Sequence, residues 1–345
     1  MNIVYLYSQI MPYQTIVYEA LSKRGVNVFA FENKDLLQTP FSKPYIEKVS
    51  YYYMNDYSKN GLLEKVKTLR PAILVVCGWN VKNYRYVARY YRTKTDIPVV
   101  CPIDTQYIGK LKQMVGCLTS SMYVKRLFTH IWVPGVRQYD FARRLGYDNQ
   151  HIIMNSLTAD TKLFLSAKID ELKSDIYPKR FLFVGRYSVV KGLDLLIDAW
   201  KSISNKKGWR VTLVGNGPLK EKLENQEGFD VLDFQDQSTL KMIAEKSGFF
   251  ILPSIYEPWA LVLQEFAAAG LPILCSDACG ASPHFVVNGF NGFTFRNGDV
   301  KELAKKMERI IDLNDMQLLE YAHNSREISH YVTPEISAAS LLGIM

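Results

Sequence analysis

The stretch PSIYEPWALVLQEFAAAGLPI, residues 253–273, decides how the chain folds. It begins at the end of the apolar run FFILP and ends within another, PILCS, and apolar residues recur at helical spacing between them. A buried strand, a helix and a second buried strand in succession form the repeating unit of a parallel sheet covered by helices. Residues 253–273 therefore predict an α/β fold.

The same alternation extends outward from this stretch to both ends of the chain. In the second half we expect strands at 181–185, 211–215, 231–234, 249–253 and 272–276 and helices at 192–203, 218–226, 238–247, 258–269 and 299–312. In the first half we expect strands at 2–7, 26–31, 72–77, 97–101 and 130–133 and helices at 14–24, 59–69, 82–93 and 137–145.

A length of 345 residues favours two domains. We expect an N-terminal Rossmann-like domain over 1–155, a linker over 156–178 and a second Rossmann-like domain over 179–328. Segment 329–345 is expected to cross back to the first domain. No run of about 18 apolar residues is present, and the start lacks the layout of a signal peptide. These features predict a cytoplasmic protein. The five cysteines are expected to be reduced thiols, with neither a disulfide framework nor a zinc site.

The positive charge is concentrated in the first half of the chain. Residues 1–150 hold 21 Lys and Arg against 10 Asp and Glu, a net charge of +11, and 17 of the 22 tyrosines. Such a domain suits nucleic acid, an anionic membrane surface or a phosphorylated acceptor. An ordinary solvated basic surface would have the same composition.

Two loops of the second half have the composition of an anion site. Ligands of open α/β sheets bind beyond the carboxyl ends of the strands. Arg186 follows a predicted strand directly after Gly185, and Lys191 begins the next helix, which forms a cationic pair suited to a diphosphate. Gly215 opens the loop Gly-Asn-Gly-Pro, where main chain can approach a ligand closely, although a plain turn would look the same.

A third loop carries two carboxylates. Glu257 precedes a predicted helix with Pro258 as its first residue, so free main-chain amides would face the same ligand as Glu257. Glu265 lies about two turns further along that helix. Carboxylates accept hydrogen bonds from paired hydroxyls, as on ribose or a hexose. Glu265 could instead be an ordinary surface glutamate, but the small apolar residues after it suit burial.

A fourth loop runs from Cys279 to His284 and continues into the Asn-Gly turns of 288–293. Its glycine-rich start can expose amides to a ligand. His284 in such a position is more often a packing residue than a catalyst.

These motifs together resemble the retaining family-4 glycosyltransferases, the group 1 glycosyl transferases. The resemblance rests on PSIYEPWALVLQEFAAAGLPI with its two glutamates eight apart, on VGR-x4-KG and on LVGNGP, and it covers residues 150–312. It implies a GT-B fold, in which two Rossmann-like domains face each other across a cleft. The nucleoside-diphosphate sugar would bind the second domain and the acceptor the first.

The resemblance also implies roles for individual residues. Arg186 and Lys191 would bind the diphosphate, Glu257 the hydroxyls of the transferred sugar, and Glu265 the ribose. The predicted donor site comprises Gly185, Arg186, Lys191, Gly215, Glu257, Trp259, Ala260, Leu261, Val262 and Glu265. Many members of the family have a glutamate after the proline of the fourth loop, where this chain has His284, a change expected to tune donor choice.

The first half departs from the family pattern. The usual glycine-rich loop after the first strand is replaced by SQIMPY, which ends at Tyr13. A histidine that commonly precedes an aspartate after the fourth strand is absent, which leaves Asp104 alone. Asp104, Trp79 and Tyr13 are the expected acceptor-side residues, although Asp104 and Trp79 equally suit a turn and a packing aromatic. The predicted catalytic residues are Glu257, Arg186, Lys191 and Asp104.

The expected activity is transfer of a sugar, with retention of configuration, to a glycan or lipid-linked glycan of a bacterial surface-polysaccharide pathway. No metal is expected, because no Asp-x-Asp occurs in the chain and Arg186 with Lys191 can supply the charge. No cofactor beyond the donor substrate and no nucleic acid partner is expected. The basic half is expected to dock on the inner face of an anionic membrane. A nucleotide-sugar epimerase and a non-catalytic donor-binding module are the alternatives, while a missing G-x-G-x-x-G disfavours an NAD dehydrogenase.

Overall fold

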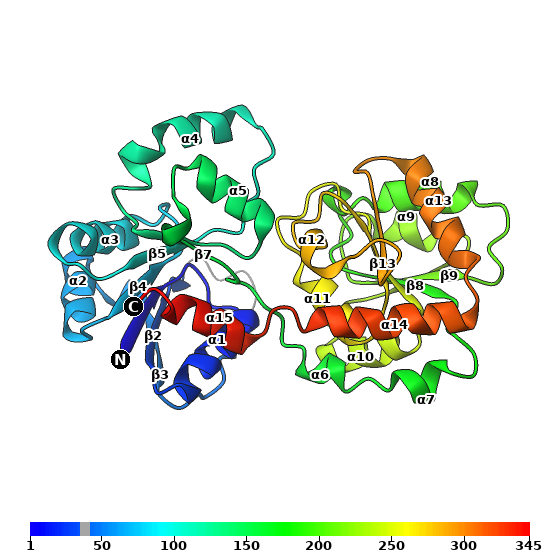
Figure 1. Cartoon of the computed structure of the whole chain (residues 1–345), viewed down its shortest axis with the longest axis horizontal. Coiled ribbons are helices and arrows are strands. Elements are labelled where there is room, and N and C mark those ends of the chain that lie inside the picture. The colour runs from blue at the N-terminus through cyan, green and yellow to red at the C-terminus, as the bar shows by residue number, and fades with distance from the viewer. Residues whose placement is uncertain (35–41) are drawn as a thin grey trace. The chain divides into compact units, whose positions relative to one another are not determined.

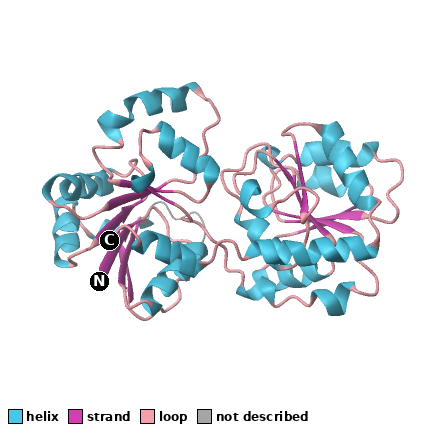
Figure 2. Cartoon of the chain, viewed as in Figure 1, coloured by secondary structure: helices cyan, strands magenta, loops and turns pink. Residues whose placement is uncertain are grey.

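The computed structural model describes residues 1–34 and 42–345, which form two compact units. The first unit comprises Met1–Thr158 and Val332–Met345, and the second comprises Ala159–Tyr331. Each unit contains a sheet covered by helices (Figures 1 and 2). All strand pairs of both sheets are parallel, which confirms the predicted α/β class.

The first unit has the strand order β3-β2-β1-β4-β5-β6-β7 among its described residues. Its strands are β1 (Asn2–Leu6), β2 (Asn27–Glu32), β3 (Val49–Tyr53), β4 (Ile73–Val76), β5 (Val99–Pro102), β6 (His130–Trp132) and β7 (Ile152–Ile153). Its helices are α1 (Pro12–Lys23), α2 (Lys59–Thr68), α3 (Lys82–Lys94), α4 (Leu111–Tyr123), α5 (Val136–Arg144) and α15 (Pro334–Leu342), with the 3-10 turns η2 (Met54–Asp56) and η3 (Asn149–His151).

Alternation along β1 divides the core of this unit between the two faces of the sheet. Val4 and Leu6 lie in one buried cluster, and Ile3 and Tyr5 lie in the other, because successive side chains of a strand point to opposite faces. The second cluster also contains Leu341 of α15, so the end of the chain helps to bury this face of the sheet.

The second unit has the strand order β10-β9-β8-β11-β12-β13. Its strands are β8 (Arg180–Val184), β9 (Arg210–Val214), β10 (Phe229–Leu232), β11 (Phe249–Leu252), β12 (Ile273–Ser276) and β13 (Gly292–Phe295). Its helices are α6 (Lys162–Leu165), α7 (Ile169–Lys173), α8 (Leu193–Ser202), α9 (Lys220–Glu224), α10 (Gln237–Glu245), α11 (Leu261–Ala268), α12 (Ser282–Phe285), α13 (Val300–Ile311) and α14 (Asp315–Ser329), with the 3-10 turn η4 (Val189–Lys191).

The segment expected to be a linker, 156–178, differs from that expectation. From Ala159 onward it belongs to the second unit and forms α6 and α7. Phe164 is fully buried with its ring 5.5 Å from that of Phe266, and the Nζ of Lys173 donates a hydrogen bond of 2.8 Å to the carbonyl of Ser247. These contacts outweigh the polar composition that suggested a linker.

Three elements of the first unit were missing from the sequence prediction. Strand β3 lies at the edge of the sheet and its residues are only partly buried, so it has no continuous apolar run. Helix α4 has one buried residue, Ser120, and no side-chain cap at Lys110. Strand β7 has two residues. Each lacks the burial pattern from which elements are recognised in a sequence.

No helix within the described residues is both long enough and apolar enough to span a bilayer. The five cysteines are free thiols, as expected.

Candidate active site

The candidate donor site lies at the carboxyl edge of the second sheet, where the strand order reverses. Strand β8 has β9 on one side and β11 on the other. The loops that follow β8 and β11 therefore start side by side, and such reversals are where α/β sheets form ligand crevices. The first loop carries Arg186 and Lys191, and the second carries Glu257.

Glycine at position 192 lets these two loops touch. Gly192 has a left-handed backbone, with φ of 68°, and caps α8. A Cβ at this position would lie 1.9 Å from the carbonyl oxygen of Pro253, so no larger residue fits without moving the loops apart. The amide of Ile255 also donates a hydrogen bond of 2.9 Å to the carbonyl of Val190. The main chain on both sides of Lys191 is thus held against the loop that carries Glu257.

Lys191 and Glu257 form an ion pair through Nζ and Oε2. Only 23% and 14% of their side chains are exposed, so their attraction is screened less than at an open surface. The hydroxyl of Ser254 donates to the same carboxylate oxygen at 3.4 Å. We expected Lys191 and Glu257 to bind separate groups of the ligand, whereas the structure joins them in one polar cluster.

The main chain from Glu257 to Trp259 is hydrogen-bonded to the loop that follows β12. The amide of Gly280 donates to the carbonyl of Glu257 at 2.9 Å, and the amide of Ala281 donates to the carbonyl of Trp259 at 2.8 Å. These bonds hold residues 257–259 in an extended loop beside the segment 279–281. Helix α11 accordingly begins at Leu261, and the prediction that it begins at Pro258 is wrong.

The start of α11 presents main-chain donors. Ala260 caps the helix in a left-handed conformation, with φ of 86°, which is unusual for a residue with a Cβ. Within residues 1–34 and 42–345, the amides of Ala260, Leu261 and Val262 have no hydrogen-bond acceptor. Together with the partial positive charge at a helix N-terminus, they suit an anionic or hydroxyl-bearing ligand.

Trp259 and His284 pack against each other. Their ring centroids are 5.4 Å apart, and Trp259 is only 3% exposed. The indole Nε1 of Trp259 is buried and has no hydrogen-bond partner in the described part of the chain. Burial lowers the pKa of His284, which favours its neutral form. The side chain of Trp259 is thus part of the packing, and its carbonyl helps to position the loop.

Glu265 lies on α11 and is partly buried. The pKa of its carboxyl is raised to about 7, chiefly by burial, while a hydrogen bond with Gln237 acts to lower it and the charge of Asp160 acts to raise it. Near neutral pH the carboxyl therefore exists in both protonation states. Perturbed carboxyls of this kind concentrate at functional sites.

The loops after β8 and β9 also pack closely main chain against main chain, as the loops after β8 and β11 do. A Cβ on Gly215 would lie 2.0 Å from the carbonyl oxygen of Gly185, and the amide of Tyr187 donates to the carbonyl of Asn216 at 2.8 Å. The side chain of Arg186 is exposed, and it has no ion pair or hydrogen bond with any residue in the described ranges. Arg186 is free to meet an anion.

The first unit has its own polar cluster at the corresponding reversal, between β1 and β4. The amide of Ser8, after β1, donates to the Sγ of Cys77, after β4, at 3.0 Å. Burial, followed by the charges of Asp104 and Cys77, raises the pKa of Tyr13 to about 12. Burial also raises the pKa of Asp104 above its usual range. Tyr13 thus interacts electrostatically with both Asp104 and Cys77.

Trp79 packs against the hydrophobic core. Its ring packs at 6.5 Å from that of Phe128 on the edge of the hydrophobic core. No local sequence pattern indicated that Ser8 and Cys77 meet, because these two residues are 69 positions apart in the chain. Ser254 lies inside the decisive motif but had no assigned role.

Comparison with known proteins identifies the class of the second unit. Residues 167–327 match the family model described as glycosyl transferases group 1. The second unit is a group 1 glycosyl transferase domain, which confirms the resemblance carried by residues 253–273.

Two relatives show how far the similarity extends. Sulfoquinovosyl transferase SQD2 of Arabidopsis thaliana is 33% identical over 242 residues, which are 68% of this chain and 41% of the relative. The capsular polysaccharide biosynthesis glycosyltransferase CapM of Staphylococcus aureus is 32% identical over 154 residues, 42% of this chain and 40% of the relative. The matches with the first three relatives cover 40%, 44% and 42% of those proteins, about two fifths of their length.

Solved structures match the whole chain. Sucrose-phosphate synthase of Thermosynechococcus elongatus has a TM-score of 0.76 at 16% identity and covers 99% of this chain and 97% of its own. HepE of Anabaena has a TM-score of 0.72 at 20% identity and covers both chains completely. At such identities the likeness shows the fold, which is GT-B as predicted.

Proposed function

We propose that this protein transfers a sugar from a nucleoside-diphosphate sugar to a glycan or lipid-linked glycan acceptor, with retention of configuration, in the biosynthesis of a bacterial surface polysaccharide. The observation that carries the proposal is the Lys191–Glu257 pair in the loops before α11, together with main-chain amides at the start of this helix that have no acceptor among the described residues. One side of the pair suits phosphate and the other suits sugar hydroxyls. The name of CapM supports a polysaccharide acceptor, and structures of HepE with UDP and UDP-glucose support a nucleotide-sugar donor.

In the proposed chemistry the positively charged groups of the site contact the diphosphate leaving group. As the bond between the anomeric carbon and the diphosphate oxygen breaks, negative charge develops on that oxygen. Arg186, Lys191 and the amides of α11 would stabilise this charge. The acceptor oxygen bonds to the anomeric carbon on the same face, and its proton passes to the departing diphosphate. Glu257 would hold the sugar hydroxyls, and Glu265 the ribose.

We assign the acceptor to the first unit. Tyr13 and Asp104, whose electrostatic interaction contributes to the raised pKa of Tyr13, would bind its hydroxyls. Replacing Asp104 with Asn is expected to lower turnover at least about tenfold while leaving the affinity for nucleoside diphosphate unchanged. Loss of nucleotide affinity in this variant would contradict the assignment.

The function is tested by incubating the protein with a panel of nucleotide sugars, beginning with UDP-glucose, with and without glycan and lipid-linked acceptors. We expect release of diphosphate that depends on the acceptor, and a product whose anomeric configuration, read by NMR, matches the donor. Interconversion of the donor alone would indicate an epimerase. Donor binding without turnover would indicate a binding module.

We further propose that transfer needs neither a divalent ion nor a cofactor, because Arg186 and Lys191 supply the charge and the chain contains no Asp-x-Asp. Activity is expected to survive a chelator. Loss of activity with the chelator and its restoration by magnesium or manganese would overturn this proposal.

A further inference from the structure

Helix α4 in the first unit carries a stripe of large apolar side chains on its outer face. Leu111 is 75% exposed and Leu118 is 84% exposed. The stripe recurs at spacings of three and four residues, which places its members on one face of the helix. It consists of Leu111, Met114, Val115, Leu118 and Met122, all exposed, with the exposed residues Ile108 and Tyr123 at its ends. Figure 1 shows α4 at the rim of the first unit.

The opposite face of α4 is polar and holds the helix in place. Ser120 is buried, and its hydroxyl donates to the carbonyl of Leu145 at 2.7 Å. The side-chain amide of Gln113 donates to the carbonyl of Gln106 at 2.8 Å and accepts from the amide of Ile108 at 2.9 Å. A surface helix of a globular protein normally turns its apolar stripe inward. Helix α4 does the reverse, and turning it over would break these hydrogen bonds, of which the one from Ser120 is buried.

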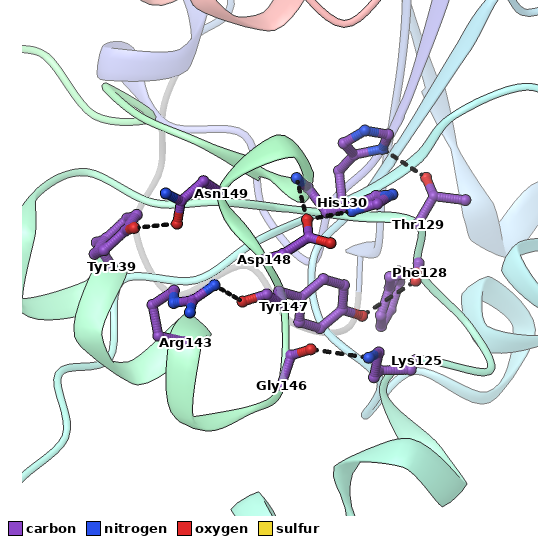
Figure 3. A network of polar contacts seen from close by, with 11 residues as sticks. Lys125, Phe128, Thr129, His130, Tyr139, Arg143, Gly146, Tyr147, Asp148 and Asn149 are labelled. Atoms are coloured by element: carbon purple, nitrogen blue, oxygen red, sulfur yellow. Dashed lines mark hydrogen bonds and ion pairs between the residues drawn. The ribbon is translucent and has the colours of Figure 1, made fainter.

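The chain beyond α4 is also fixed. Figure 3 shows Lys125 donating to the carbonyl of Gly146 at 2.8 Å and the hydroxyl of Tyr147 donating to the carbonyl of Phe128 at 3.1 Å. The guanidinium of Arg143 donates to the carbonyl of Tyr147 at 3.0 Å. These bonds tie the end of α4 to the turn after α5. The outward orientation of the stripe is thus fixed by hydrogen bonds within the first unit.

The segment that carries the stripe is positively charged, and Asp140, whose charge reaches Cys117 of α4, is paired with Arg144. Residues 105–139 contain no aspartate or glutamate. The basic residues of this segment are Lys110, Lys112, Lys125, Arg126 and Arg137. Apolar residues bordered by lysine and arginine suit an interface with anionic lipid, where the stripe enters the headgroup region and the cations meet phosphate. The same charges would repel a second copy of this face.

We infer that α4 is a membrane-docking helix, whose stripe from Leu111 to Met122 inserts into the surface of an anionic bilayer. The inference deepens the proposed function, because it places the acceptor unit where a lipid-linked acceptor is presented. Its test needs no sugar transfer, so its failure and that of the proposed function are distinguishable.

The test is flotation of the full chain with phosphatidylglycerol-rich vesicles and with phosphatidylcholine vesicles. We expect binding to the anionic vesicles, weakened by salt, and at least about tenfold weaker binding in the double variant Leu111→Ser/Leu118→Ser. The matched control is Met316→Ser on α14, which removes a side chain of similar exposure, 82%, from the second unit and is expected to bind like the parent. Thermal unfolding of each variant verifies that it is folded.

A charge variant separates the electrostatic contribution to vesicle binding from that of the apolar stripe. Replacing Lys112 and Arg126 with Glu is expected to lower binding to anionic vesicles at least about tenfold, because attraction becomes repulsion. Failure of the parent to float with anionic vesicles, or equal binding by the parent and the double serine variant, overturns the inference. A parent dimer that the double serine variant dissociates, without vesicle binding, would show that a second copy covers the stripe, and this result also overturns it.

Discussion

At the scale of single residues, Lys191 and Glu257 neutralise each other in a partly buried cluster with Ser254. A ligand phosphate that binds Lys191 must compete with Glu257. Sugar hydroxyls, in contrast, can donate hydrogen bonds to Glu257 while the ion pair stays intact. The pair therefore suits a ligand that offers phosphate and hydroxyls together. A nucleoside diphosphate alone lacks the transferred sugar whose hydroxyls would meet Glu257.

The two glutamates are predicted to have separable effects. Glu265→Ala should weaken binding of the nucleoside diphosphate about tenfold, because the ribose hydroxyls lose a charged acceptor. Glu257→Ala should chiefly weaken binding of the complete nucleotide sugar. Calorimetric titration with UDP and with UDP-glucose measures both, and Glu320→Ala, an exposed glutamate of α14, is the control. Equal losses for both ligands in both variants would refute the assignment.

The raised pKa of Glu265 predicts a pH dependence of nucleotide binding. With a pKa of about 7, the carboxyl is mostly protonated at pH 6 and mostly ionised at pH 8, and the ionised form is the better acceptor. The ratio of the UDP affinity of the parent to that of Glu265→Gln should rise up to about tenfold over this range, which follows the ionised fraction. Taking the ratio removes the ionisation of UDP itself. Parallel pH profiles for the two proteins would count against the role of Glu265.

The raised pKa of Glu265 also determines how its carboxyl changes the free energy of unfolding with pH. Burial raises the pKa in the folded chain above the unfolded value of about 4.3, so between these values the folded state keeps a proton that the unfolded state releases. The stabilising contribution is full below pH 4 and declines as the pH rises to about 7. The form that binds ligand is therefore the less stable form of the free protein.

At the scale of elements, the site depends on close contact between loops that follow neighbouring strands. Gly192 permits this contact on one side of β8, and Gly215 permits it on the other. Both glycines lie where a side chain would meet main-chain oxygen, which cannot move aside as a flexible side chain can.

Gly192→Ala is predicted to separate the loops after β8 and β11 and to break the Lys191–Glu257 pair. Donor affinity should fall at least about tenfold, and stability should fall by about 1 to 3 kcal/mol. Gly208→Ala is a matched control, because Gly208 has a similar φ of 81° but open space around its Cβ position. Donor titration and urea unfolding of both variants provide the measurement. If the control loses as much donor affinity as Gly192→Ala, backbone strain and not loop contact explains the effect.

At the scale of the whole molecule, the chain leaves the first unit at Thr158 and returns to it at Val332. Helix α15 then covers one face of the first sheet, with Ala338 and Leu341 fully buried. The stability of the first unit therefore depends on residues that are last in the sequence, whereas the second unit is continuous.

Leu341→Ala is predicted to destabilise the first unit by about 2 to 4 kcal/mol through loss of buried surface and the cavity left behind. Scanning calorimetry with and without UDP separates the units, because a ligand raises the transition of the unit that binds it. We expect the UDP-sensitive transition to stay unchanged while the other falls. Ile336→Ala, which removes a side chain that is 38% exposed, should have little effect. A fall of both transitions in Leu341→Ala would contradict this division.

Much of the fold could be predicted because the responsible patterns are local. The strands at 181–185 and 249–253 are apolar runs, and the helix at 299–312 begins with an aspartate that caps it, Asp299. Strand β3 and helix α4 could not be predicted in this way, because one is an edge strand and the other exposes its apolar residues. Patterns of burial identify only those elements that bury an apolar face.

By itself the sequence determined the parallel α/β class, the group 1 motifs and the loops in which Arg186, Lys191, Glu257 and Glu265 lie, because each is encoded within a few consecutive residues. Only the tertiary structure decided which of these residues meet. Lys191 and Glu257 are 66 residues apart and pair because β8 and β11 are neighbours at the reversal of strand order. Local periodicity places a side chain on a strand, a helix or a loop, but contacts across a sheet depend on the strand order, which the packing of the whole unit selects.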